Sequence, residues 1–271
     1  MPQIPILLYH SISEVAAAPY KRWAVHPEQF ARQLDHLRAE GYTALTVSQL
    51  VETRTARGAL PERPVLLTFD DGLADFYTGA LPLLKRYGFT ATLYITTDYV
   101  GQTSRWVTPD GEGDRPMLSW EQISEIDTCG IECGAHTRSH PQLDVLSLKR
   151  AREEILGSKG VLEQRLGKPV TSFAYPHGYH SPALKRLVRE SGLTSACAVK
   201  HAMSSPSDEV TSLARIIVSG DTDLATFKKL LRGEGLPVAP RREKLETTGW
   251  RYLRRAKKML NLSLQKDEVY G

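Results

Sequence analysis

Short apolar segments alternate with longer amphipathic segments along most of this chain. The apolar segments are mostly continuous runs, which is typical of parallel strands that are covered on both faces. They are Ile4–Tyr9, Thr43–Thr46, Val65–Phe69, Thr90–Ile95, Ile131–Ala135, Thr171–Tyr175, Thr194–Ala198 and Arg215–Val218. Strand and helix repeated this often predict a parallel sheet, and seven or eight units in one domain favour a barrel over an open sheet.

The segments between the predicted strands have helical periodicity. One predicted helix contains Phe30 and stops before Gly41, and a longer one runs from Ala151 to a stop at Gly167. The segment Gly101–Arg115 is rich in Gly, Asp and Thr and predicts a long loop over one end of the barrel.

Composition narrows the class of protein. The chain has 271 residues, 41% of them hydrophobic, and a net charge of +4, so a disordered chain is excluded. Its longest apolar run, Ile4–Tyr9, is far short of the roughly 18 residues of a membrane span and lacks the features of a secretory signal. Three cysteines fit no disulfide framework. We therefore expect a cytoplasmic protein.

Composition changes after about residue 233, where a segment rich in Gly and Pro precedes one dense in Arg and Lys. We expect a barrel domain over residues 1–235, and a linker with a basic amphipathic helix over residues 236–271. Because the basic excess is concentrated in this tail and no recognised nucleic-acid module is present, we expect no nucleic-acid partner.

The basic tail has two interpretations. Trp250 and Leu253 fall on one helical face, with Arg251, Arg254 and Arg255 largely off it. The helix could pack on the barrel through Trp250 and Leu253 with its charges in solvent. Alternatively, it could bind the surface of an anionic membrane as a peripheral contact.

Ionisable or turn-forming residues follow four of the predicted strands. In a barrel of alternating strands and helices, functional residues lie on the loops after the C-terminal ends of the strands. The residues at these positions are His10, the pair Asp70 and Asp71, the pair His136 and His140, and the segment from Tyr175 to Gly178. We expect them to meet on one face of the barrel.

The paired acids and the paired histidines fit a metal site. Adjacent carboxylates such as Asp70 and Asp71 are costly to bury unless a cation or a proton compensates them, although an Asp-Gly turn is an alternative explanation. Histidines four residues apart, His136 and His140, can converge on one ion. Two histidines with one carboxylate and an open position are typical of catalytic zinc.

Two sequence motifs resemble a known family. Thr68–Gly72 reads TFDDG and His136–His140 reads HTRSH. Both are similar to motifs of the polysaccharide deacetylases, the NodB-homology group also called carbohydrate esterase family 4, and the resemblance extends over roughly residues 4–232. The start Leu7–Ile12, which contains Tyr-His, resembles the branch that deacetylates poly-N-acetylglucosamine. The resemblance implies a distorted, TIM-like (β/α)7 barrel, so one of the eight predicted strands would not join it.

The third family motif is only partly present. The segment Phe173–Gly178 keeps Pro176 and the final glycine, but Ala174 stands where the family has an arginine that orients the catalytic aspartate. Arg215, at the start of a predicted strand, is the candidate replacement, although an arginine there is most often a surface charge.

The resemblance implies roles for the converging residues. One divalent metal, zinc first with cobalt, nickel or manganese as alternatives, would be held by Asp71, His136 and His140, and Asp70 would be the base. The backbone N–H of His177 would stabilise the oxyanion. Tyr175 and Pro176 would provide further contacts to the oxyanion or the substrate. Thr137 would support the loop that carries the two histidines.

The general acid is the least defined role. The family's Leu-x-His motif is absent after residue 201. His10 is the best candidate for this role, with His177 and His180 in reserve, and a hydrogen-bonded structural role for His10 is the alternative.

Together these features predict a metal-dependent hydrolase that removes the acetyl group of an N-acetylglucosamine-containing polysaccharide or oligosaccharide and releases acetate. One alternative is a deacetylase of a lipid-linked or small acetylated glycoside at the cytoplasmic face of the membrane. A second is a barrel that binds saccharides without catalysis, which Ala174 and the missing last motif would allow.

Overall fold

The computed structural model describes residues 3–237, 239 and 245–259, including the side chains of residues 249–256. The strands are β1 (Ile6–Tyr9), β2 (Ser11–Ile12), β3 (Ala24–Val25), β4 (Thr43–Ala44), β5 (Pro64–Phe69), β6 (Thr92–Ile95), β7 (Glu132–Ala135), β8 (Ser172–Ala174), β9 (Ser195–Cys197) and β10 (Ile216–Ile217). The α-helices are α1 (Pro27–Ala39), α2 (Val47–Thr55), α3 (Leu81–Tyr87), α4 (Trp120–Thr128), α5 (Leu148–Leu166), α6 (Pro182–Glu190), α7 (Leu224–Leu231) and α8 (Leu245–Met259). Shorter helical turns are η1 (Ala18–Trp23), η2 (Phe76–Ala80), η3 (Thr97–Tyr99), η4 (Arg105–Asp110), η5 (Leu143–Val145), η6 (Pro176–Gly178) and η7 (Val210–Ser212).

A curled parallel sheet forms the centre of the molecule. Its strands follow the order β10-β1-β5-β6-β7-β8-β9, and β4 pairs with β5 off this path. Beyond the end of this order, Cys197 in β9 and Leu213 form an isolated parallel bridge. The predicted parallel barrel is thereby confirmed in the form of a curled half-barrel, and the extra strand that does not join its path is β4.

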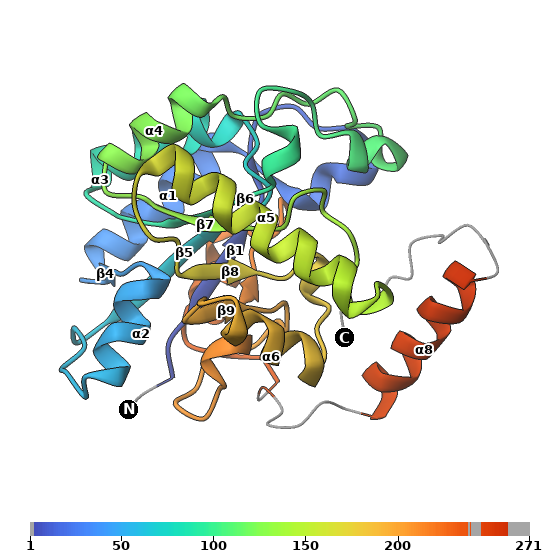
Figure 1. Cartoon of the computed structure of the whole chain (residues 1–271). Coiled ribbons are helices and arrows are strands. Elements are labelled where there is room, and N and C mark those ends of the chain that lie inside the picture. Colours follow the sequence, from blue (N-terminus) through green and yellow to red (C-terminus); the bar gives the residue numbers. More distant parts are fainter. Residues whose placement is uncertain (1–2, 238, 240–244, 260–271) are drawn as a thin grey trace.

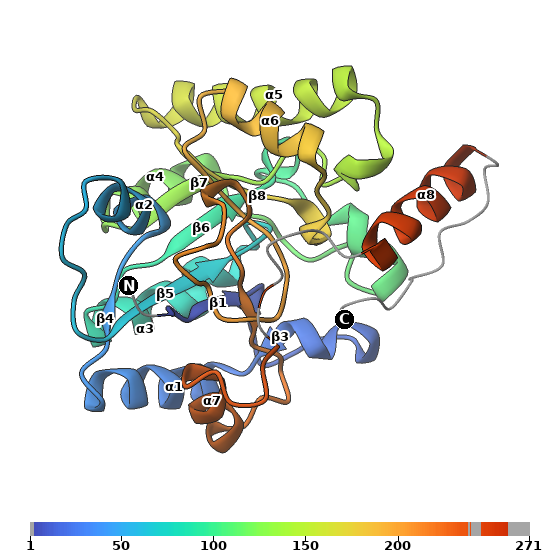
Figure 2. The same cartoon turned by 90° about the horizontal axis from the view of Figure 1, so that it is seen from below.

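Helices cover both sides of the sheet (Figures 1 and 2). Helices α1 and α7 contact each other along one side, and α5 and α6 contact each other along the other. Every residue of β1 and β5 is buried, as the continuous apolar runs predicted. None of the described helices is both long and apolar enough to cross a membrane.

The register of the sheet aligns the ends of its strands. Tyr9 pairs with Phe69 between β1 and β5, so the next residues, His10 and Asp70, leave the sheet side by side. In the same way Ile95 at the end of β6 pairs with Ala135 in β7. Parallel pairing therefore delivers the ionisable residues to one edge.

Two predicted helices are confirmed and one predicted strand is too long. Helix α1 ends at Ala39, before the stop at Gly41, and α5 ends before Gly167, which is left-handed with φ of 67°. Of the predicted strand Thr43–Thr46, only the first two residues pair with β5. The reason is that Thr46 instead caps α2, because its hydroxyl accepts from the backbone of Gln49 while that side chain accepts from the backbone of Thr46.

The C-terminal segment folds into a helix, but it does not pack as predicted. Leu253 of α8 is 42% exposed, whereas Arg251 and Arg254 are 8% and 4% exposed. Of the two interpretations of the tail, packing through Leu253 with Arg251 and Arg254 in solvent is therefore wrong, whereas Arg255 is exposed as that interpretation expects. The physical reason is a buried carboxylate, Asp144 of η5, which lies 2.5 Å from the Nη2 atom of Arg254. Residues 240–244 and 260–271 of the predicted tail lie outside the described residues.

The close packing of β7 gives a test of the fold. A Cβ atom on Gly134 would lie 2.6 Å from ring carbons of Tyr94 and 3.0 Å from the carbonyl oxygen of Ser172. We expect Gly134→Ala to lower the free energy of unfolding by about 1–3 kcal/mol in urea denaturation, because a buried ring and the backbone must move. The control is Gly160→Ala in α5, where nothing lies within 4 Å. This change should be neutral or stabilising by up to about 1 kcal/mol, and equal losses in both variants would contradict the packing.

Candidate active site

A tight turn after β5 carries the two acids. Asp71 has a φ of 79° and Gly72 a φ of 84°, so two successive residues are left-handed. Glycine adopts this conformation easily, whereas an aspartate there stores backbone strain. Asp70 and Asp71 are only 3% and 4% exposed. The turn thus presents two carboxylates in a site from which water is largely excluded.

The loop after β7 carries the two histidines in a similarly strained backbone. Thr137 and His140 have φ values of 67° and 58°. The Thr137 hydroxyl accepts a hydrogen bond of 3.0 Å from the backbone N–H of His140, which fixes the turn between the two histidines. Thr137 therefore lies where its predicted supporting role requires.

A residue that sequence reasoning missed also holds this loop. The carboxylate of Glu154, on α5, accepts hydrogen bonds of 2.9 Å from the backbone N–H groups of Arg138 and Ser139 and one of 2.8 Å from the Ser139 hydroxyl. A glutamate on a long helix gives no sign in the sequence of such a contact, because the contact depends on how α5 packs beside β7.

The side chains of Asp71, His136 and His140 converge. One ligand atom from each lies within 4.8 Å of the other two. The Oδ1 atom of Asp71 is 3.5 Å from Nε2 of His136 and 3.3 Å from Nε2 of His140. These are the residues predicted to hold the metal.

The chemistry of this group fits a cation. Nδ1 of His136 lies 2.8 Å from the carbonyl oxygen of Ala174, which can only accept, so this nitrogen carries the proton. In the neutral imidazole, Nε2 therefore presents its lone pair toward the carboxylate of Asp71. Lone pairs aimed at one another are stabilised by a cation among them, and two imidazoles with one carboxylate suit a divalent transition metal.

Arg215 forms a buried, two-pronged ion pair with Asp70. Its Nη1 and Nη2 atoms lie 2.6 and 2.7 Å from the two carboxylate oxygens, and its side chain is fully buried. It comes from the residue before β10, not from the position where the family has its arginine. Burial alone would raise the pKa of Asp70, but the charge and the hydrogen bonds of Arg215 hold this pKa below its ordinary value.

His10 lies at the same site but outside the metal-ligand group. Its ring packs on that of Trp23, with a centroid separation of 4.6 Å. Burial lowers the pKa of His10 below its ordinary value, while the carboxylates of Asp71 and Asp70 act in the opposite direction. Burial outweighs these charges, so it is the position of His10 beside the two acids, and not its pKa, that makes it the candidate acid.

The other two candidate acids have less favourable surroundings. Burial lowers the pKa of His177 to about 3 and that of His180 to about 4. Both imidazoles are therefore neutral near pH 7. His177 has a φ of 57°, and its ring centroid lies 4.8 Å from that of His140, so its loop does border the metal-ligand group.

Tyr175 and Pro176 belong to the framework of the site. The Tyr175 hydroxyl is buried and donates a hydrogen bond of 3.0 Å to the carbonyl of Thr211, so it does not point to a substrate. Pro176 is buried and has no N–H group to offer an oxyanion. Of the predicted oxyanion segment, the backbone of His177 is what remains available for this role.

Aromatic side chains surround the histidines, and sequence reasoning missed them. Trp106, from η4 in the predicted loop Gly101–Arg115, stacks on His140 with a centroid separation of 5.1 Å. Tyr179 stacks on His177 at 5.9 Å. No sequence motif marks a tryptophan or tyrosine in a loop as part of a site, because only the tertiary structure places these residues against the histidines.

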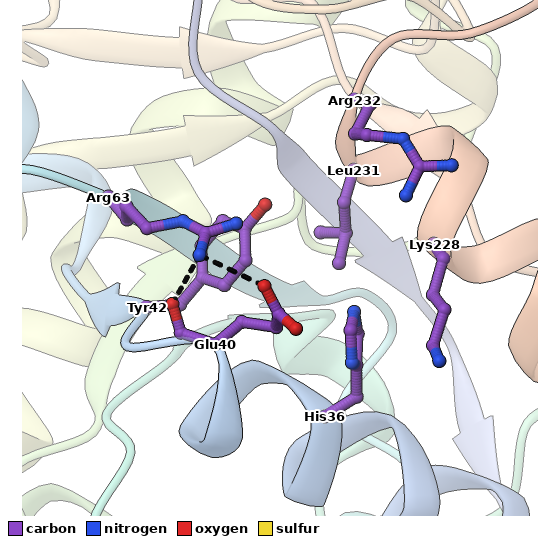
Figure 3. Close-up of a pocket in the computed structure, with 7 residues that line it drawn as sticks. All are labelled: His36, Glu40, Tyr42, Arg63, Lys228, Leu231 and Arg232. Atoms are coloured by element: carbon purple, nitrogen blue, oxygen red, sulfur yellow. Dashed lines mark hydrogen bonds and ion pairs between the residues drawn. The ribbon is translucent and has the colours of Figure 1, made fainter.

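A pocket lies away from this chemistry. It is lined by His36, Glu40, Tyr42, Arg63, Lys228, Leu231 and Arg232, beside the end of α1 and the start of β5 (Figure 3). It lies near the N-terminal ends of the strands, whereas the acids and histidines follow their C-terminal ends. Arg63 is occupied there by the carboxylate of Glu40 at 3.0 Å and by the ring of Tyr42.

The comparison with protein families agrees with this site. The sequence profile described as polysaccharide deacetylase matches residues 57–196, which include both acids and both histidines. The chain belongs to the polysaccharide deacetylase family. It is therefore a carbohydrate deacetylase, a hydrolase whose family uses a divalent metal. His10, Arg215 and α8 lie outside the matched residues.

Individual relatives support the same assignment. The chain is 24% identical over 215 residues to the poly-beta-1,6-N-acetyl-D-glucosamine N-deacetylase of Staphylococcus epidermidis, covering 74% of this chain and 70% of that one. The structure of the Streptococcus pyogenes deacetylase PplD in complex with acetate is similar, with a TM-score of 0.74, 25% identity, and 85% and 98% of the two chains covered. The polysaccharide deacetylase BC0361 of Bacillus cereus gives a TM-score of 0.72 and 26% identity over 85% of this chain and 69% of its own.

The pair of Arg215 and Asp70 can be tested by its effect on stability. Removing one partner of a buried ion pair costs about 3–5 kcal/mol, so Arg215→Ala should lower the free energy of unfolding by that order. Because the pairing lowers the pKa of Asp70, its contribution is present above the ordinary carboxyl pKa and is lost as the pH falls. The difference from the wild type should therefore shrink below roughly pH 4.

The matched control breaks an exposed pair. Arg152 lies 3.0 Å from Glu190, and both side chains are about half exposed. Arg152→Ala should cost no more than about 1 kcal/mol in the same denaturation series. A loss for Arg215→Ala as small as this would show that the buried pair is not structurally important.

Proposed function

We propose that this enzyme hydrolyses the acetamide of an N-acetylglucosamine-containing polysaccharide or oligosaccharide and releases acetate. The observation that carries the proposal is the position of Asp70, which is fixed by Arg215 directly beside the group formed by Asp71, His136 and His140. The names of the relatives support the substrate class, because one acts on poly-beta-1,6-N-acetyl-D-glucosamine and another was solved with acetate.

Zinc is the proposed metal, held by Asp71, His136 and His140. Two histidines and one carboxylate are a frequent set in catalytic zinc sites, and cobalt, nickel and manganese are the alternatives. When bound, such a cation acts as a Lewis acid that polarises a carbonyl oxygen and lowers the pKa of a coordinated water. The hydrogen bond from His136 to Ala174 keeps Nε2 free to bind it.

Asp70 is the proposed general base. Its lowered pKa keeps it ionised at neutral pH, so it can accept a proton from the attacking water. Both of its oxygens are held by Arg215, which orients the carboxylate without protonating it. In the family an arginine at the position of Ala174 orients the catalytic aspartate. Here Arg215 does so from another strand.

His10 is the proposed general acid, and the backbone N–H of His177 is the proposed oxyanion donor. An amine leaves poorly unless its nitrogen is protonated, so a cationic imidazole near the acetamide is needed. Burial lowers the pKa of all three candidate histidines, to about 3 for His177 and about 4 for His180, and at His10 the carboxylates of Asp71 and Asp70 act against this effect. A backbone donor aimed at the developing charge typically contributes about 3–4 kcal/mol.

Two expectations about the surroundings of the enzyme stay predictions: a cytoplasmic location and contact of the tail with an anionic membrane. Arg251 and Arg254 are buried against the barrel, so they do not face outward for such a contact. Pelleting with vesicles that contain anionic phospholipid tests the membrane contact, which would favour a lipid-linked substrate. Acetate release from soluble N-acetylated oligosaccharides would favour the proposed substrate.

The metal ligands and the base should respond differently to substitution. Asp71→Ala, His136→Ala and His140→Ala should each lose bound metal and acetate release together, because two protein ligands hold the ion poorly against water. Asp70→Asn keeps the shape of the side chain but removes the proton acceptor. It should retain metal while turnover falls by a factor on the order of 10² to 10⁴.

Metal content by elemental analysis and acetate release from N-acetylated oligosaccharides check these variants. A ligand variant that kept stoichiometric metal and normal turnover would remove that residue from the site. Wild-type protein that binds metal but releases no acetate would favour saccharide binding without catalysis.

The role of His10 can be separated from a structural role by changing the leaving group. His10→Ala should retain metal but lose acetate release from an acetamide, because the amine then leaves without a proton. The loss should be smaller for p-nitrophenyl acetate, whose leaving oxygen needs no proton from the enzyme. Equal losses on both substrates would indicate that His10 shapes the site instead.

A further inference from the structure

Helix α8 docks on the barrel through charged side chains. Arg254 Nη2 lies 2.5 Å from the Asp144 carboxylate, Arg251 Nε lies 3.8 Å from it, and Nε of Arg255 donates to the Asp144 carbonyl at 2.7 Å. Asp144 is 1% exposed. A buried carboxylate with arginines on one helix sets the orientation of that helix more narrowly than apolar contact would.

Asp144 is part of the same loop as a metal ligand. It lies four residues after His140, in η5, whose neighbouring Leu143 is buried in the core at 1% exposure. The anchor of α8 is therefore close along the chain to the loop that presents His140.

The same arginines also reach the loop after β8. Nη2 of Arg251 donates a hydrogen bond of 2.9 Å to the carbonyl of His180, and the guanidinium of Arg254 lies 3.9 Å from the ring centroid of Tyr179. That ring in turn stacks on His177. The arginines of α8 therefore connect two loops that come from different strands, β7 and β8.

The exposed face of α8 shows that this contact is specific. Tyr252 and Leu253 are 64% and 42% exposed, while Arg251 and Arg254 are buried. A helix docked only to cover apolar surface would bury Leu253. The family profile ends at residue 196, so this helix is outside the part of the chain that matches the family.

We propose that α8 is a positioning element of the active site. By bonding Asp144 and covering Tyr179 at the same time, Arg254 fixes the loop of His177 relative to the loop of His140. The distance from the oxyanion donor to the metal-ligand group is set by this connection. The inference rests on the proposed function for its catalytic consequence, whereas the connection itself is independent of that function.

The decisive variant is Arg254→Ala in the metal-loaded, full-length enzyme. A misplacement of about 1 Å at a catalytic group can cost up to 10²-fold in rate, so we expect kcat to fall roughly 10- to 100-fold. KM should stay within about 2-fold and metal content should not change, because substrate contacts and metal ligands are untouched. Arg254→Lys keeps the charge beside Asp144 but not the planar stack on Tyr179, and should recover part of kcat.

Two control variants separate positioning from general effects. Leu253→Ala changes an exposed residue of the same helix, and Arg150→Ala removes an arginine of α5 whose side chain is 74% exposed. Both should leave kcat unchanged. If Arg254→Ala does not fold, Asp144→Asn removes the charge while keeping the shape, and the same fall in kcat is expected.

Hydrogen exchange of the backbone amides provides a readout that needs no activity. Arg254→Ala should speed exchange in residues 177–180, and Leu253→Ala should not. Unchanged exchange there, or an unchanged kcat, overturns the inference, as does a loss of kcat that occurs only together with loss of metal. If the wild type releases no acetate, the proposed function fails, but the exchange result still tests the connection.

Discussion

Two adjacent carboxylates are held out of water at the centre of this enzyme, and the rest of the site compensates their charge. Desolvating one carboxylate costs several kcal/mol unless attraction to a partner charge offsets this free energy. The guanidinium of Arg215 binds both carboxylate oxygens of Asp70. Asp71 instead faces the imidazole nitrogens of His136 and His140, so its charge calls for a cation. The different partners explain how neighbouring residues of one motif can serve as a base and as a metal ligand.

Holding these groups together requires an unfavourable backbone conformation at several residues. Four non-glycine residues of the site, Asp71, Thr137, His140 and His177, have positive φ among the described residues. Each such residue costs about 1–3 kcal/mol and persists only where its surroundings fix it. The Thr137 hydroxyl and the carboxylate of Glu154 supply such constraints for the loop after β7. The strain is thus concentrated where orientation matters for chemistry.

The family motifs account for only part of this site. The matched residues 57–196 contain the metal-ligand group and the base. The partner of the base, Arg215, and the proposed acid, His10, come from β-strand ends outside that segment, and β1 and β10 are neighbours in the sheet. The strand order β10-β1-β5 brings them to the acids that follow β5. An arginine lost from one strand can therefore be replaced from another, provided that its guanidinium reaches the same carboxylate.

The parallel sheet, the helices α1 and α5, and the residues that meet at the strand ends could all be predicted from the order of residues alone. These follow from apolar runs, helical periodicity and the topology of parallel strands, all of which are local or general. The order of residues does not reveal which way α8 faces, that Glu154 holds the metal loop, or that Trp106 stacks on His140. These features appear only in the folded chain, because each depends on a contact between distant segments. For α8, the buried charge of Asp144 outweighed the apolar pattern on which the prediction relied.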